Sequence, residues 1–227
     1  MILALFVALL AYIIAQIVVS SKKYKGDEPL ILPSGNIMIF DTETNGFPKD
    51  WKASLYDTDN WSRVVSIAWN KIAPNGQLLS SKYYLIKPDN YSIQEEATSI
   101  HGISTEMAKA KGVSLKYAIE DFNSDISDCK CLVAHNIEFD YPTVFAEYYR
   151  LMMNTTTLSS LKRICTMKIS TDFCKIPSAK GYKYPKLNEL HQKLFSTSIS
   201  GTHNAQTDAE ATMKCLKELY NKKILRF

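Results

Sequence analysis

The stretch IMIFDTETNG, residues 37–46, joins an apolar run directly to two acids. Ile37–Phe40 predicts a buried β-strand, because strands covered on both faces are typically continuous apolar runs. Asp41 and Glu43 are two positions apart, so in a strand their side chains point to the same face. Two such carboxylates repel each other, and burial of either is costly without a partner or a metal ion. The stretch alone leaves two interpretations open: solvent-facing acids at a strand end, or half of a site for a hard divalent cation.

Acids and histidines recur at two later points. AHNIEFD, residues 134–140, follows an apolar segment and places Asp140 near the start of a predicted helix, where Asp is also a common N-cap. HNAQTD, residues 203–208, places Asp208 in the first turns of the last predicted helix, where the helix dipole favours an acid. Five residues of a continuous helix turn about 500°. His203 can therefore work beside Asp208 only from the loop that enters this helix.

The order of these motifs resembles the DEDDh family of 3′–5′ exonucleases, which includes polymerase proofreading exonucleases and ribonuclease T. D-x-E, H-N-x-x-F-D and H-x-A-x-x-D follow one another within residues 36–219, and IHGIS at residues 100–104 is similar to the family's I-H-G-I-T. The resemblance implies a ribonuclease H-like fold and hydrolysis of terminal phosphodiesters of DNA or RNA, with release of nucleoside 5′-monophosphates.

The resemblance also implies roles for individual residues. Two divalent ions, Mg²⁺ or Mn²⁺, would be held by Asp41, Glu43, Asp140 and Asp208. His203 would be the general base, since an imidazole with a pKa near ~6.5 can take a proton from water at neutral pH. The expected substrate-binding residues are Thr42, Thr44, Gly46, His101, Ile103, Asn136 and Phe139.

The hydrophobic patterning predicts an α/β domain with a mixed five-stranded sheet flanked by helices. The expected strands are residues 36–43, 63–71, 78–87, 131–134 and 164–167. The expected helices are residues 114–127, 142–152, 187–194 and 204–221. Pro142 is expected in the first turn of its helix, and Asn75-Gly76 favours a tight hairpin between the second and third strands.

Three features have two interpretations each. The insertion at residues 47–62 carries Trp51, Tyr56 and Trp61, which either cap the substrate entrance or anchor the loop to the core. The basic, tyrosine-containing segment at residues 180–186 is either a solvated surface or part of a groove for single-stranded nucleic acid. His101 either contacts the terminal base or makes a structural hydrogen bond, and His135 is expected to be structural.

The N-terminal run at residues 2–19 has no charged side chain. As a helix it would span about 27 Å, close to the thickness of a bilayer core. We therefore expect a transmembrane anchor over residues 1–20, a linker over 21–34 and the exonuclease domain over 35–227. A lysine cluster follows the run, which predicts a single-pass protein with its catalytic domain in the cytoplasm. A cleaved signal peptide and a buried helix are the alternatives.

The bulk composition is that of a globular protein, with a formal net charge of only +4 and five cysteines. The total charge gives no strong nucleic-acid signal. The cysteines form no C-x-x-C pair, which argues against zinc and disulfide frameworks and favours reduced thiols in the cytoplasm. The expected partners are a single-stranded nucleic acid with a free 3′ end, the membrane, and replication or repair proteins. A catalytically silent nucleic-acid-binding module and a membrane scaffold for such a protein are the competing functions.

Overall fold

A computed structural model describes residues 35–201 and 203–226, which belong to one compact unit, Ile31–Phe227. The predicted anchor over residues 1–20 and the linker over 21–34 lie outside the described residues. Within the described part of the chain, no helix is long and apolar enough to cross a bilayer.

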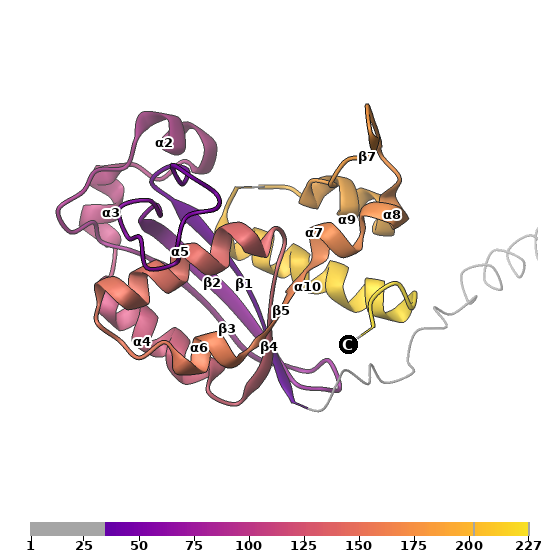
Figure 1. Ribbon diagram of the computed structural model, residues 1–227, viewed down its shortest axis with the longest axis horizontal. Coiled ribbons are helices and arrows are strands. Elements are labelled where there is room, and N and C mark those ends of the chain that lie inside the picture. The colour runs from indigo at the N-terminus through magenta and orange to yellow at the C-terminus, as the bar shows by residue number, and fades with distance from the viewer. Residues whose placement is uncertain (1–34, 202, 227) are drawn as a thin grey trace, which may run out of the picture. The chain divides into compact units, whose positions relative to one another are not determined.

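A mixed sheet of five strands forms the centre of the domain, as the sequence predicts (Figure 1). The strands are β1 Asn36–Thr44, β2 Val64–Ile72, β3 Leu78–Leu85, β4 Cys129–Ala134 and β5 Lys162–Cys165. Their order is β3-β2-β1-β4-β5. β2 is antiparallel to both β1 and β3, whereas β4 is parallel to both β1 and β5.

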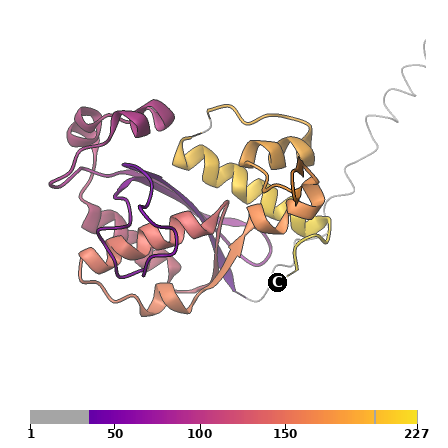
Figure 2. The same cartoon turned by 45° about the horizontal axis from the view of Figure 1, so that its top comes forward.

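Helices cover both faces of this sheet. They are α2 Glu95–His101, α3 Thr105–Lys111, α4 Leu115–Ile126, α5 Ile137–Arg150, α6 Thr156–Ser160, α7 Thr166–Ile169, α8 Thr171–Cys174, α9 Leu187–Phe195 and α10 Ala205–Asn221. A two-stranded hairpin of β6 Pro177–Ser178 and β7 Gly181–Tyr182 precedes α9. α10, yellow in the figures, packs on β1 and β2 on one face, and α4 and α5 pack on the other (Figures 1 and 2).

The alternation of β1 decides which of its side chains reach which face. Met38 and Phe40 pack into the main core with residues of α4 and α5. Asp41 has the opposite parity and is the cross-strand partner of Ala68, which packs against Ala205 and other residues of α10. β1 therefore carries its acids on the face that α10 covers.

β1 is longer than its parallel neighbour. Its last partner in β4 is Val133, opposite Ile39, and β1 continues to Thr44. The edge of β1 beyond this point is free for other hydrogen-bond partners. Ligands of open α/β sheets commonly bind beyond the carboxyl ends of parallel strands, and the ends of β1 and β4 meet here.

The predicted start of α5 is wrong. The helix begins at Ile137, so Pro142 is its sixth residue and not a first-turn residue. Asn136 has a left-handed conformation, with φ 76° and ψ 52°, which turns the chain from β4 into the helix without a longer loop. Asn adopts this region more readily than most side chains. Pro142 cannot donate the helical hydrogen bond to the carbonyl of Glu138, and the helix continues through it.

Other element boundaries differ from the predictions by one or two residues. β5 ends at Cys165 rather than at residue 167, because Thr166 already begins α7. The tight hairpin predicted between β2 and β3 is confirmed: Gly76 N–H donates to Ala73 O at 2.8 Å, and Gly76 has φ 79°. This is a β-turn with Gly76 at its end, in a left-handed conformation that glycine adopts without a steric cost.

All five cysteines are free and buried in the domain. They come from four elements: Cys129 and Cys131 of β4, Cys165 of β5, Cys174 of α8 and Cys215 of α10. Burial raises the pKa of Cys129, Cys131 and Cys215 to about 12. These thiols therefore act as small apolar side chains in the folded protein.

Candidate active site

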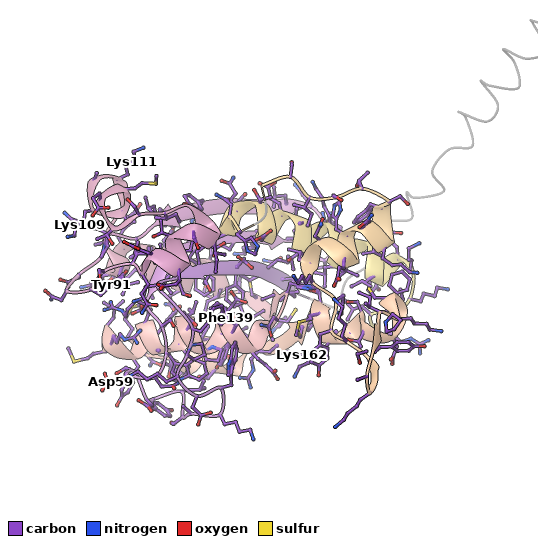
Figure 3. The ribbon with its side chains drawn as sticks, turned by 90° about the horizontal axis from the view of Figure 1, so that it is seen from above. Asp59, Tyr91, Lys109, Lys111, Phe139 and Lys162 are labelled. Carbon is purple, nitrogen blue, oxygen red and sulfur yellow. The ribbon has the colours of Figure 1, made fainter. Side chains whose placement is uncertain are left out.

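A cleft of about 390 Å³ opens at the carboxyl ends of β1 and β4. Figure 3 shows Phe139, one of its lining residues, between the layer of α10 and the layer of α5. Ile103 is the one residue of the predicted site that does not line it. The predicted site residues that do are Asp41, Thr42, Glu43, Thr44, Gly46, His101, Asn136, Phe139, Asp140, His203 and Asp208.

Three of the predicted metal ligands form a tight cluster. Asp41, Glu43 and Asp208 each offer a carboxylate oxygen, and these oxygens lie within 4.8 Å of one another. Burial, followed by the charges of Asp140, Asp208 and Glu43, raises the pKa of Asp41 well above its usual value. Burial and the charges of Asp208 and Asp140 raise the pKa of Glu43 to about 8. The cluster therefore favours uptake of positive charge, as protons or as a cation.

Asp208 supplies the observation that fits a metal ion. Its Oδ1 is buried, and no hydrogen-bond donor among the described residues reaches it. A buried acceptor without a partner is costly in the absence of a ligand. Carboxylate oxygens converging on one point are the donor set that hard divalent cations bind. The residues present thus fit the divalent metal that the motif implies.

Asp140 is set apart from the tight cluster. It is buried, and its Oδ1 accepts hydrogen bonds from the N–H of Thr42 at 2.9 Å and from the Oγ1 of Thr42 at 2.8 Å. Burial raises its pKa to about 7, although the hydrogen bonds from Thr42 act in the opposite direction. The free edge of β1 thus holds the carboxylate of Asp140 in place. The N–H and hydroxyl of Thr42 both donate to this carboxylate rather than to a substrate.

His203 lies in the loop before α10, where the spacing of the motif requires it. Asn204 is the N-cap of the helix, and its side chain accepts from Gln206 N–H and Thr207 N–H. The backbone N–H of His203 donates to Asp208 Oδ2 at 2.9 Å. Its side chain is exposed and lines the cleft, and its charge opposes the effect of burial on the pKa of Asp208. Its role as general base stays a prediction.

His101 joins two backbone segments beside the cleft. Its Nε2 is 3.2 Å from Thr44 O, and its Nδ1 accepts from Ile103 N–H at 3.1 Å. A carbonyl can only accept, so Nε2 carries the proton. Both ring nitrogens thus make structural hydrogen bonds, which leaves the ring face and carbon edge for a substrate. Contact of His101 with the terminal base stays a prediction. Ile103 itself is buried in a small core with Val65 and Ala97, and its substrate contact stays a prediction.

The insertion at residues 47–62 is anchored to the core and also reaches the cleft. Trp61 is buried, and its Nε1 donates to Ser54 O at 2.9 Å. The Arg150 guanidinium donates to Trp61 O at 2.6 Å. Trp51 instead lies against Phe139, with ring centroids 5.9 Å apart. The anchoring interpretation is therefore confirmed for Trp61, and capping of the substrate entrance by Trp51 stays a prediction.

Six residues of the cleft escaped the sequence prediction. They are Phe47, Gln94, Glu96, Ala97, Ile100 and His135. Most come from α2 and its N-cap, a helix too short to show a period. The sequence did mark both ends of α2, with the acids Glu95 and Glu96 in its first turn and Gly102 after its last residue. Acids are typical of helix N-termini and glycine of C-termini, and Gly102 indeed has φ 76°.

His135 has the structural role that the sequence predicts. Its Nε2 donates to Pro185 O at 2.9 Å, and its Nδ1 is 3.0 Å from Thr166 Oγ1. It thereby ties the basic segment at residues 180–186 to the end of β4. Tyr182 and Tyr184 of this segment are exposed, and their contact with nucleic acid stays a prediction.

The burial of His135 predicts a loss of stability in acid. Burial lowers its pKa from 6.5 to about 4. Protonation then favours the unfolded chain, so the stabilisation is complete above about pH 6.5 and is lost as the pH falls toward 4. The free energy of unfolding in EDTA should fall over this range by up to about 3 kcal/mol more in the wild type than in His135→Gln. His191→Gln is the control and should keep the wild-type slope. Parallel pH profiles for wild type and His135→Gln would contradict this.

Comparisons with known proteins agree with this geometry. A family model described as exonuclease, RNase T, matches residues 38–216. E. coli exonuclease I in complex with a dT13 oligonucleotide is 20% identical, with a TM-score of 0.67 over 83% of this chain and 41% of that chain. The zinc-bound E. coli exonuclease I–ssDNA complex is also 20% identical, with a TM-score of 0.68 over 83% and 41%. A product-bound exonuclease I is 18% identical, with a TM-score of 0.65 over 84% and 45%.

The chain spans less than half the length of these solved structures. At such identities the likeness establishes the ribonuclease H-like fold. No curated protein sequence matches the chain. The family model, however, covers nearly the whole described domain and includes all four acids and His203. The chain therefore belongs to the RNase T family of exonucleases, as the DEDDh order of its motifs predicts.

Proposed function

We propose that this protein is a metal-dependent 3′–5′ exonuclease that hydrolyses the terminal phosphodiester of a DNA or RNA strand and releases nucleoside 5′-monophosphates. The observation that carries the proposal is the cluster of Asp41, Glu43 and Asp208, with the buried, unpartnered Oδ1 of Asp208. His203 stands at the same cleft on a loop tied to Asp208. Acids that favour a cation, next to an exposed imidazole, suit phosphodiester hydrolysis.

The four acids would hold two divalent ions, Mg²⁺ or Mn²⁺. Asp41, Glu43 and Asp208 offer the converging oxygens, and Asp140 adds the oxygen that Thr42 does not occupy. Bound there, the ions would supply Lewis-acid activation of the attacking water and neutralise the charge on the departing 3′ oxygen.

The side chains of the cleft perform the remaining tasks. His203 accepts the proton of the attacking water at its imidazole, since its side chain is solvent-exposed beside Asp208. Phe139 stacks on a base, and the ring face of His101 borders the terminal nucleotide. Asn136 makes no side-chain capping bond in α5, so its amide is available to the substrate. Thr44 and Gly46 line the cleft, and their backbone would meet the terminal nucleotide there.

A single strand with a free 3′ end is the substrate that we propose. The similar E. coli exonuclease I structures hold dT13 and dA16 oligonucleotides. The aromatic rings at the cleft can stack only on unpaired bases, because a base inside a duplex has no free face for stacking.

An end-labelled oligonucleotide distinguishes this activity from the alternatives. With Mg²⁺, a 3′-labelled single strand should lose its label as a mononucleotide before any shortening from the 5′ end, and EDTA should stop the reaction. Matched DNA and RNA strands, single and paired, establish the preference. Release from the 5′ end or internal cuts would contradict the proposal, and binding without cleavage in both Mg²⁺ and Mn²⁺ would favour the silent binding module.

We also propose that residues 1–20 anchor the protein in a membrane through residues 21–34, with the catalytic domain in the cytoplasm. The uncharged run and the lysines after it support this arrangement. The full chain should remain with membranes after alkaline carbonate extraction. The domain should resist protease added outside intact cells, and its digestion there would overturn the orientation.

A further inference from the structure

A second groove lies next to the cleft, behind the first turn of α5. Its volume is about 720 Å³. Asn136, Phe139 and Asp140 line the cleft, whereas Glu138 and Tyr141 line the groove. The same turn of helix is therefore the wall between the two spaces, and a chain leaving the cleft has only this turn to cross.

Aromatic rings continue across this wall. Phe47 and Trp51 flank Phe139 on the insertion at residues 47–62, with ring centroids 6.1 Å and 5.9 Å from that of Phe139. Phe139 and Phe47 line the cleft, and Trp51 lines the groove. Phe47 is 71% exposed and Trp51 is 53% exposed. Large rings that stay exposed beside a cleft are suited to stacking on unpaired bases.

Cations line the groove beyond Trp51. Lys52 and Arg163 are both exposed there, and neither forms an ion pair within the part of the chain that the structure describes. The Arg163 guanidinium lies over the ring of Tyr141, 4.4 Å from its centroid, which orients the charge. Lys168 is paired with Glu138. The unpaired guanidinium and ammonium are suited to phosphate oxygens.

We propose that this groove binds the nucleotides upstream of the terminal one, in a single strand whose 3′ end lies in the cleft. A base stacks on the exposed face of Trp51, and Lys52 and Arg163 contact the phosphates that follow. The inference rests on the proposed function and adds a subsite to it. The alternation of aromatic surface and unpaired positive charge selects a single-stranded polynucleotide as occupant, because stacking requires unpaired bases.

The affinity ratio of a long to a short oligonucleotide tests the groove. Fluorescence anisotropy in EDTA gives the affinity of the full chain for 5′-labelled oligothymidylates of two and eight nucleotides, and for oligouridylates of the same lengths. The wild type should prefer the longer strands. Trp51→Ala should lower this preference by about tenfold. Arg163→Ala should lower it as well and should reduce the slope of log affinity against log salt by about 1.

Two matched variants control for surface changes. Tyr117→Ala removes an aromatic ring of similar exposure, 55%, from α4. Lys162→Ala removes the exposed cation next to Arg163 in β5, where strand alternation turns it away from the groove. Both should keep the wild-type length preference. Unchanged preference in Trp51→Ala and Arg163→Ala would overturn the proposal, with near-native thermal melts showing that the variants fold.

Hydrolysis of the two-nucleotide substrate in Mg²⁺ separates this inference from the proposed function. If the wild type cleaves the dinucleotide but Trp51→Ala keeps the wild-type length preference, the groove is refuted and the exonuclease stands. If neither the two-nucleotide nor the eight-nucleotide strand is cleaved in Mg²⁺, but the variants lose the length preference in binding, the groove stands and the exonuclease is refuted. A difference between the DNA and RNA series identifies which polymer the groove holds.

Discussion

Asp208→Asn should lower the rate of 3′-terminal hydrolysis by about 10³-fold and at the same time raise the melting temperature of the metal-free protein. The rate falls because bound cations contribute several kcal/mol to hydrolysis, and each 1.36 kcal/mol changes a rate about tenfold. The stability rises because Asp41, Glu43 and Asp208 crowd their charges together within 4.8 Å. Few substitutions are expected to abolish activity and stabilise the fold together.

The pH dependence of this stabilisation has a definite sign. Burial raises the pKa of Asp208 in the folded protein. Above the pKa of the unfolded chain, near ~3.9, ionisation therefore favours unfolding, and the penalty grows as the pH rises toward the folded value. In EDTA the melting temperature of Asp208→Asn should exceed that of the wild type most at pH 8, and the difference should shrink toward pH 4.

Mg²⁺ and a neighbouring acid provide the controls. Mg²⁺ should raise the melting temperature of the wild type by mass action, and much less that of Asp208→Asn. Glu210→Gln, two residues along α10 and outside the acidic cluster, should keep both the activity and the response to Mg²⁺. A fully active Asp208→Asn enzyme would remove the proposed metal site.

His203→Gly should lower kcat by about 10²- to 10⁴-fold, the usual contribution of a general base. Glycine suits this position because residue 203 has φ 63°, in a region that glycine adopts freely. The backbone N–H that donates to Asp208 Oδ2 remains in the variant. KM and the stabilisation by Mg²⁺ should therefore change little.

Added imidazole distinguishes a base from a structural residue. It should restore part of the rate of His203→Gly, and the restored rate should rise with pH as more imidazole becomes unprotonated. If His203→Gly keeps the wild-type rate and imidazole does not increase it, His203 is excluded as the base. Asp208→Asn gives the matched negative control, since imidazole should restore nothing there.

The parts of the fold that the sequence predicts are those with a local period. The alternation of β1 places Asp41 and Glu43 on one face, and the 3.6-residue stripe of α10 places Ala205, Ala209 and Leu219 in the core. Both follow from spacing alone. Because Asp208 lies on a helix that packs over β1, these two local patterns were nearly sufficient to predict the cluster of Asp41, Glu43 and Asp208.

Long-range contacts were outside the reach of such patterns. The hydrogen bonds of Thr42 to Asp140 join residues 98 positions apart. They are possible because β1 extends beyond the end of β4. The contact of Trp51 with Phe139 likewise depends on how a loop folds back. The start of α5 was predicted too late because proline usually marks a helix boundary. In the structure the helix begins directly after the turn at Asn136, and Pro142 lies inside it.

The buried thiols give the protein an internal probe of its own opening. Because the five cysteines lie in β4, β5, α8 and α10, an aromatic disulfide reagent can modify them only when those elements expose them. Cys215 sits on the same helix as Asp208, and Cys131 on the strand that ends at the cleft. The number of thiols that react, and how fast, would show whether Mg²⁺ suppresses the opening of α10 alone or that of the whole sheet. Fluctuations of the catalytic scaffold can thus be measured without introducing a label.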